Sequence, residues 1–253
     1  MPVVLIEKKT PRITILTLNR PERRNALTLE LMNELIAAIR VASDESSERV
    51  LILRGAGLAF CAGLDLQATT VQNSHATAEM VAKTLLTLSQ TRLITIAAVH
   101  GAAVAGGAGI MSACDYVVAA ERTKIGYPEV RRGLVPGLVM TFLRRQVRER
   151  YIRELLFSGE LIEAERAREM GLVNRVVSAA DVMKTAQEFA DSVLLGAPEA
   201  VVQTKRLIEE LWSSPVKKDI DLALQYHLQA RKSAEASEGI AAFNEKRPPK
   251  WTE

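Results

Sequence analysis

Two glycine-containing turns are the stretches of this sequence whose backbone could itself do chemistry. The first is AFCAGLDL (residues 59–66), and the second is AVAGGAGIMSACD (residues 103–115), which carries almost no functional groups before Asp115. Each follows a strand-like run, and a glycine turn can expose peptide N–H groups. Two such groups from different turns, converging on one oxygen, would form an oxyanion hole. The alternative is structural, with glycines that only make room for a helix to pack on a sheet.

Neither turn has the pattern of a nucleotide-binding loop. No Lys-Ser or Lys-Thr pair follows the glycines, as a P-loop requires, and the acidic residue expected after a dinucleotide-binding turn has no clear place. The three histidines, His75, His100 and His227, share no metal-ligand spacing with one another or with Cys61 and Cys114. We therefore expect no metal site and interpret the histidines as structural or solvated.

One carboxylate follows the second turn, at Glu129 in the segment IGYPEVRRG. Taken alone, it is most simply a surface group paired with Arg131 or Arg132. Asp115, at the end of the glycine-rich stretch, is expected to have a structural role at a sheet edge rather than a catalytic one.

An α/β core of alternating strands and helices must position these groups. A helix is predicted from Thr28, a plausible N-cap, because apolar residues recur after it at helical spacing. The segment 67–91 is predicted to be a loop in its first half and a helix in its second. Strands are predicted where short β-branched or alternating runs end at proline or glycine: 13–21, 49–57, 93–103, and twice within 114–130.

Strands all but stop after Pro136, and the rest of the chain is predicted to be helical. Gly171 is expected to cap one of these helices at its C-terminus. No linker separates the two parts, so we place a soft boundary near residue 195, between a core domain (1–195) and a helical C-terminal region (196–253). The predicted helices are 138–157, 163–170, 181–195, 198–212 and 216–243.

Composition narrows the class of protein further. The chain has 253 residues, a net charge of +3 and no lysine- and arginine-rich tract interleaved with aromatics, so no nucleic-acid partner is expected. Two cysteines do not make a disulfide framework, which favours a reducing compartment. The N-terminal MPVVLIEKKTPRITIL lacks the unbroken apolar stretch of a signal peptide, and the one long uncharged run (93–114) is too rich in glycine and alanine for a membrane span. We expect a cytoplasmic protein.

Six segments resemble the crotonase superfamily, the enoyl-CoA hydratase/isomerase fold, in order and spacing. They are LNRPERRNALT, FCAGLDL, AAVHGAAVAGGAGIMSACDYVVAAE, IGYPEVRRGLVPG, FSGELIEAERAREMGLVNRVV and EGIAAFNEKRPPKW. The resemblance covers nearly the whole chain. It implies a ββα spiral core with a helical C-terminal region, and an enzyme that stabilises the enolate of an acyl-CoA thioester. Coenzyme A would enter as part of the substrate, with no separate cofactor.

The resemblance also assigns roles to individual residues. The two oxyanion-hole N–H groups would come from Leu64 and Gly106, and Glu129 would be the catalytic acid or base. A second glutamate of the classical hydratases falls at Gly109, so that acid is absent here, and the glycine is expected to leave room for water or a bulkier acyl chain. Coenzyme A would be bound by Arg23, Arg24, Ala26, Asp65 and Leu66, and by Phe243 and Lys246, which in relatives reach the nucleotide of a neighbouring subunit.

This pattern favours an isomerase slightly over a hydratase. Hydration must activate water and protonate C2, which two carboxylates divide readily, whereas one base can move a proton from C2 to C4. The alternatives are hydration of a 2-enoyl-CoA with a single glutamate, a weakly catalytic acyl-CoA-binding relative, or an RNA-associated relative. The family's usual assembly is a homotrimer or a dimer of trimers, and the loop 67–78 is expected to cover the acyl pocket.

Overall fold

The computed structural model of the chain describes residues 2–69 and 72–252, and its framework is a six-stranded sheet in the order β1-β2-β3-β4-β6-β9. The edge strand β1 runs antiparallel to β2, and the other neighbours are parallel. The bounds are β1 (Val4–Thr10), β2 (Ile13–Leu18), β3 (Val50–Gly55), β4 (Ile94–Val99), β6 (Tyr116–Ala120) and β9 (Arg175–Val177).

Helices cover both faces of this sheet, so nearly all residues of its central strands are buried. Along β3, Leu51 and Leu53 point into the main core, whereas Val50 and Ile52 point into a second cluster against helix α7 (Val182–Leu194). The alternation of β2 does not mark a solvent-facing side, because all six of its residues are buried. In a parallel sheet covered on both faces, the side chains on both faces of a strand are buried.

A second sheet lies beside the first and carries the glycine-rich stretch. It has the order β5-β7-β8, with β5 (Ala102–Val104), β7 (Lys124–Gly126) and β8 (Leu161–Glu163). The run predicted as one strand over 93–103 is thus two strands, because the chain turns at Gly101, whose φ is +65°. A left-handed φ of this kind favours glycine.

Two helix caps predicted from the sequence are present, and one predicted helix is divided in two. The Thr28 hydroxyl accepts a hydrogen bond from Leu31 N at 3.2 Å, and Gly171 adopts the left-handed conformation at its helix end, so both caps are confirmed. The predicted helix 138–157 is instead two helices that break at 147–148. The helices are α1 (Leu29–Asp44), α2 (Ser74–Gln90), α3 (Gly106–Ser112), α4 (Gly137–Gln146), α5 (Glu149–Ser158) and α6 (Ala164–Met170).

The expected loop 67–78 is wrong at its end, because α2 begins at Ser74; residues 70–71 of it lie outside the described residues. Short 3-10 helices complete the order: η1 (Pro21–Arg23), η2 (Pro128–Arg132) and η3 (Lys250–Thr252). No helix in the described ranges is long and apolar enough to cross a membrane.

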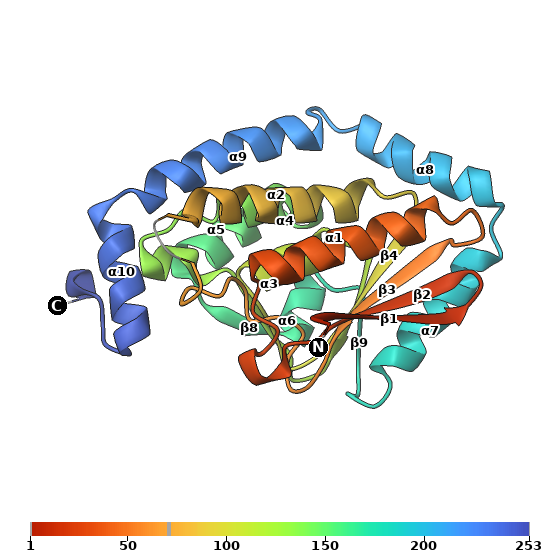
Figure 1. Cartoon of the computed structure of the whole chain (residues 1–253), viewed down its shortest axis with the longest axis horizontal. Coiled ribbons are helices and arrows are strands. Elements are labelled where there is room, and N and C mark those ends of the chain that lie inside the picture. The colour runs from red at the N-terminus through yellow and green to blue at the C-terminus, as the bar shows by residue number, and fades with distance from the viewer. Residues whose placement is uncertain (1, 70–71, 253) are drawn as a thin grey trace.

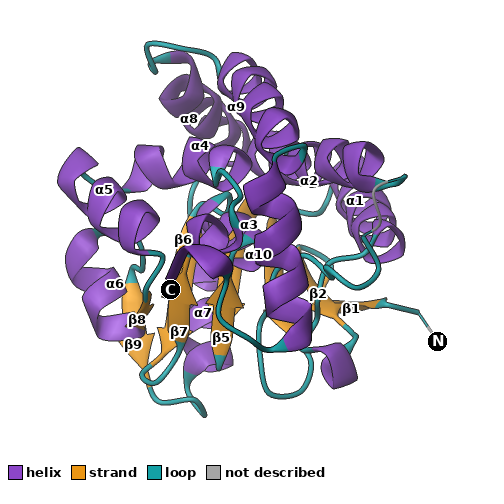
Figure 2. Cartoon of the chain, turned by 90° about the vertical axis from the view of Figure 1, so that its left-hand side faces the viewer, coloured by secondary structure: helices purple, strands orange, loops and turns teal. Residues whose placement is uncertain are grey.

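The C-terminal helices wrap around the core. Figure 1 shows α8 (Pro198–Glu210) and α9 (Val216–Arg231) crossing above α1 and α2, with α10 (Ala234–Glu245) turning down at one end. The predicted helix 216–243 is therefore two helices, because Ser233 caps a new one and accepts a hydrogen bond from Ala236 N. Figure 2 looks at this end of the molecule, where α10 lies toward the viewer. There α10 packs on η2, since a Cβ added to Gly239 would lie 2.4 Å from Arg132 C. Since α9 contributes to the main core, the boundary at residue 195 stays a prediction.

Candidate active site

The two glycine-containing turns meet in space. Cys61 and Ala103 form an isolated parallel bridge between them. A Cβ added to Gly63 would lie 3.4 Å from Gly106 N, and a Cβ added to Gly106 would lie 3.9 Å from Leu64 N. The peptide N–H groups of Leu64 and Gly106 are therefore neighbours, although their residues are far apart in the sequence.

Gly106 is the first residue of helix α3, although its sequence predicts a turn there. The N–H groups of a first helical turn have no partner within the helix, and the helix dipole places partial positive charge there. The residue before it, Ala105, has φ 52° and ψ −122°, a backbone conformation that residues other than glycine rarely adopt. Such strain is held in place by surrounding structure and is common at functional sites.

The Leu64 N–H is left free by the pairing of its neighbours. Leu27 N donates to Gly63 O at 2.8 Å, and Asp65 N donates to Leu27 O at 2.9 Å. This pairing skips the Leu64 amide, which has no acceptor among the described residues. Both predicted oxyanion donors are thus without an acceptor among the described residues, and both residues line the same cavity.

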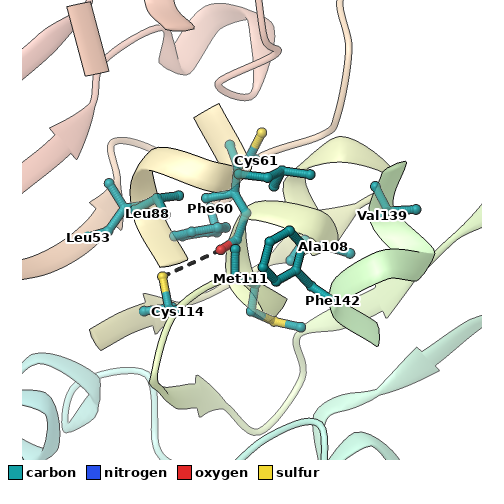
Figure 3. Packing of buried hydrophobic residues seen from close by; sticks show 14 of the residues in the cluster. Leu53, Phe60, Cys61, Leu88, Ala108, Met111, Cys114, Val139 and Phe142 are labelled. Carbon is teal, nitrogen blue, oxygen red and sulfur yellow. Dashed lines mark hydrogen bonds between the residues drawn. The ribbon is translucent and has the colours of Figure 1, made fainter. Parts of the chain in front are cut away.

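The expectation that Gly109 leaves room is wrong. A Cβ on Gly109 would lie 2.6 Å from Val139 Cγ1 and 3.6 Å from Leu85 Cδ2. Figure 3 shows Val139 and Phe142 of α4 packed beside Ala108 of α3. The position where hydratases carry their second glutamate is therefore closed by an aliphatic contact between α3 and α4.

Glu129 is buried rather than on the surface. It lies in η2 with 8% of its surface exposed, and its Oε2 has no hydrogen-bond partner. Arg131 pairs instead with Glu160 at 3.8 Å, and no ion pair within 4 Å involves Glu129 in the described part of the chain. Burial raises the pKa of Glu129 to about 7. A carboxyl group with such a pKa can both take and return a proton near neutral pH.

Leu64, Gly106 and Glu129 line one cavity. The space between its walls, with the open solvent at its mouth, is about 760 Å³. The remaining wall is mostly apolar and comes from α2, α4 and the segment before α4: Ala78, Val81, Leu134, Pro136, Leu138 and Val139.

Three polar residues in this wall were not assigned from the sequence. Arg132 follows Glu129 in η2, and its guanidinium lies 4.2 Å from the centre of the Phe243 ring. His227 and Arg231 come from α9. The Nδ1 of His227 is 3.4 Å from Val135 O, and burial lowers the pKa of His227, which keeps the ring neutral near neutral pH.

A sequence signal for the α9 residues exists. Ile220 and Ala223 are buried, and His227 and Arg231 continue the same helical face at four-residue steps. An apolar stripe that becomes polar without changing face indicates that the helix runs from the core to the wall of a cavity. The predicted role of His227 as structural or solvated left this position unused.

The residues predicted to bind coenzyme A share a second cavity, a groove of about 1010 Å³. It adjoins the first cavity, since Leu64, Leu66 and Phe243 line both. The structure thus brings together segments from both ends of the chain, including all seven predicted residues: Arg23, Arg24, Ala26, Asp65, Leu66, Phe243 and Lys246.

These seven residues differ in whether their side chains already have partners within the protein. Asp65 is 5% exposed, and its carboxylate lies 3.3 Å from Arg20 Nη2 and 3.4 Å from Arg23 Nη2, so it holds the turn together. Arg24 and Lys246 are exposed and form no ion pair within the described ranges. They are the cations of the groove that are free to meet an anion.

The remaining predicted residues have structural partners. Asp115 accepts hydrogen bonds from Thr95 N and Lys205 Nζ, each at 2.7 Å, which fits its predicted structural role. His75 lies at the start of α2 rather than in a loop, and His100 Nε2 is 2.9 Å from a backbone carbonyl. Over residues 2–69 and 72–252, no group of acidic, histidine or cysteine side chains could hold a metal ion.

Comparison with known proteins agrees with this geometry. The sequence model of the enoyl-CoA hydratase/isomerase family matches residues 8–253. An enoyl-CoA hydratase of Mycobacterium tuberculosis is 35% identical, over 99% of this chain and 96% of its own. An enoyl-CoA isomerase/hydratase of Mycosarcoma maydis is 32% identical, over 94% and 91%. The crystal structure of an enoyl-CoA hydratase from Mycobacterium avium superposes with a TM-score of 0.88 at 30% identity, covering 99% of both chains.

The architecture is the crotonase fold, an α/β framework with its site between the sheet's loops and the C-terminal helices. The chain belongs to the enoyl-CoA hydratase/isomerase family, and it is an enzyme of that family.

Proposed function

We propose that this enzyme isomerises 3-enoyl-CoA thioesters to 2-enoyl-CoA thioesters, with Glu129 as the single proton shuttle. The thioester oxygen would accept hydrogen bonds from the N–H groups of Leu64 and Gly106. The observation that carries the proposal is that Glu129 is the one carboxyl group among the described residues lining the cavity, beside those two free donors.

The proposed reaction balances with these groups alone. The Glu129 carboxylate removes a proton from C2, and the C–H electron pair forms a dienolate whose charge rests on the thioester oxygen. The carboxyl group then delivers the proton to C4, and the double bond that lay between C3 and C4 now lies between C2 and C3. One oxyanion donor contributes about 10²–10³ in rate in enzymes of known mechanism.

The pKa of Glu129 suits this task, since burial raises it to about 7 and the group can both accept and donate near neutral pH. Arg24, Lys246 and the backbone of the groove would hold the coenzyme A part of the substrate, with Phe243 at the junction of the two cavities. The proposed proton transfer needs no cofactor beyond this coenzyme A.

The second candidate is hydration of a 2-enoyl-CoA, favoured by the names of several relatives, which are enoyl-CoA hydratases. In that reaction Glu129 alone would both activate water and return a proton to C2. The contact between Gly109 and Val139 argues for isomerisation, because it fills the place of the second acid with aliphatic carbon. A trimer or dimer of trimers remains our proposal for the assembly.

The test offers purified protein a 3-enoyl-CoA and a 2-enoyl-CoA in parallel, with Glu129→Gln as the variant. Glu160→Gln, an exposed carboxyl group beside Arg131, is the matched control. Turnover of the 3-enoyl substrate alone, lost in Glu129→Gln and kept in Glu160→Gln, supports isomerisation. Water addition to the 2-enoyl substrate would establish the hydratase instead, and a fully active Glu129→Gln would refute the assignment of the proton shuttle. Tight binding of coenzyme A without turnover would indicate a binding relative.

A further inference from the structure

Three residues that line the cavity of Leu64, Gly106 and Glu129 each have a buried polar atom without a hydrogen-bond partner. These atoms are Glu129 Oε2, Arg132 Nε and Arg231 Nη1. The first belongs to the proposed proton transfer, but that reaction uses neither guanidinium. In the described part of the chain, the side chains of Arg132 and Arg231 make no hydrogen bond and no ion pair within 4 Å.

An unpaired buried guanidinium N–H is costly, because it has lost water and gained no acceptor. Burial lowers the pKa of both arginines, which is the same penalty seen through titration. Arg132 interacts electrostatically with the Glu129 carboxylate, but the two form no hydrogen bond and no ion pair within 4 Å among the described residues, and Glu129 Oε2 has no partner. One carboxylate therefore leaves the donors of two guanidinium groups without an acceptor. The cavity therefore holds donors in excess of its acceptors.

The phosphates of coenzyme A do not account for this excess. Their expected partners, Arg24 and Lys246, line the adjoining groove, whereas Arg132 and Arg231 line the cavity that contains Glu129 and the oxyanion donors. A guanidinium also matches the planar geometry of a carboxylate. The unmatched donors thus lie where the acyl chain of the substrate would be, and not at its nucleotide.

We infer that the acyl chain of the natural substrate carries a carboxylate, so that the substrate is a CoA monothioester of an unsaturated dicarboxylic acid, with its free carboxylate bound by Arg132 and Arg231. This inference rests on the proposed function for the position of the thioester. The two arginines come from η2 and α9, so the substrate would bridge the core and the C-terminal helices.

Binding of unreactive thioesters tests the inference without requiring turnover. Adipoyl-CoA and hexanoyl-CoA differ only in that a terminal carboxylate replaces a methyl group, and calorimetry gives the affinity of each for the full chain. We expect adipoyl-CoA to bind about 10- to 100-fold more tightly, as one or two charge-assisted hydrogen bonds allow. Equal affinities, or tighter binding of hexanoyl-CoA, would overturn the inference and mean that the arginines only hold cavity water.

The variant Arg231→Met should remove most of this preference, while Arg231→Lys should keep part of it because it retains the charge. Arg131→Met is the matched control, since Arg131 is exposed and pairs with Ser158 O and Glu160. The affinity for hexanoyl-CoA should be unchanged or higher in Arg231→Met, which also reports that the variant is folded. An equal loss for both thioesters would refute a specific role for Arg231.

Turnover separates this inference from the proposed function. A preference for adipoyl-CoA without isomerisation of hex-3-enedioyl-CoA would leave the carboxylate site established and the isomerase proposal refuted. If hex-3-enoyl-CoA is isomerised at least as fast as hex-3-enedioyl-CoA, the isomerase proposal is supported and the carboxylate site is refuted.

Discussion

The Glu129→Gln variant is expected to be more stable than the wild-type chain above neutral pH. The pKa of Glu129 rises from 4.5 in the unfolded chain to about 7 in the folded one because of burial. Between these values the folded state holds a proton that the unfolded state has released, so Glu129 lowers the free energy of unfolding as the pH rises through this window. At 1.36 kcal/mol per pKa unit, the loss is roughly 3 kcal/mol at about pH 8. A neutral amide does not carry this cost.

Urea unfolding of both proteins at about pH 8 and about pH 5 measures the effect, because the midpoint moves with the free energy of unfolding at constant slope. The advantage of Glu129→Gln should be roughly 3 kcal/mol at the higher pH and under about 1 kcal/mol at the lower one. Glu160→Gln, which changes an exposed carboxyl group, should show no such dependence on pH. If Glu129→Gln has the same advantage at both pH values, the carboxyl group is not desolvated and the reasoning is wrong.

Three further outcomes follow from the same geometry. With Glu129 acting as a base in its carboxylate form, kcat/KM for a 3-enoyl-CoA should fall about tenfold per pH unit below about pH 7, and a flat pH–rate profile from about pH 5 to 8 would contradict this role. Gly109→Ala should lower the free energy of unfolding by about 1–3 kcal/mol in urea, because its Cβ would lie 2.6 Å from Val139 Cγ1. Adding Val139→Ala should recover part of this loss, and strictly additive effects of the two substitutions would disprove the contact. Ala105→Gly should leave the melting temperature unchanged or raise stability by up to about 1 kcal/mol, since glycine accepts the positive φ; the loss usual for alanine to glycine would show that Ala105 is not strained.

Local chemistry made much of this fold predictable. The side chain of Thr28 and the backbone freedom of Gly171 act within one turn of a helix, so each residue identifies its own cap. The helix break at Ser233 had the same kind of signal, a capping residue, and was missed because the apolar pattern continues across it. The glycine turns were placed by their spacing, but which of their N–H groups are free depends on strand pairing that spacing does not reveal.

Long-range packing made the rest unpredictable. That Gly109 is filled by Val139 follows from how α4 docks on α3, and a glycine in a sequence does not tell whether its space is empty or occupied. The surroundings of η2 were likewise hidden, because α10 packs on Arg132 and Gly133 from about 100 residues further along the chain. The sequence suggested Arg132 only as the partner of a surface carboxylate and gave no reason to single out Arg231. Their place in the cavity wall follows only from how η2 and α9 come together in the fold.

The division of the cavity wall between distant segments has a consequence for how such enzymes diversify. The groups proposed for proton transfer and enolate binding come from residues 64–129, whereas His227, Arg231 and Phe243 come from the last two long helices. If the acyl chain occupies this cavity as proposed, mutation in the C-terminal helices would change which acyl chain is accepted while the proposed reactive groups stay in place. Exchange of this segment between relatives would be an evolutionary route, and a practical engineering route, to new acyl preferences with the same reaction.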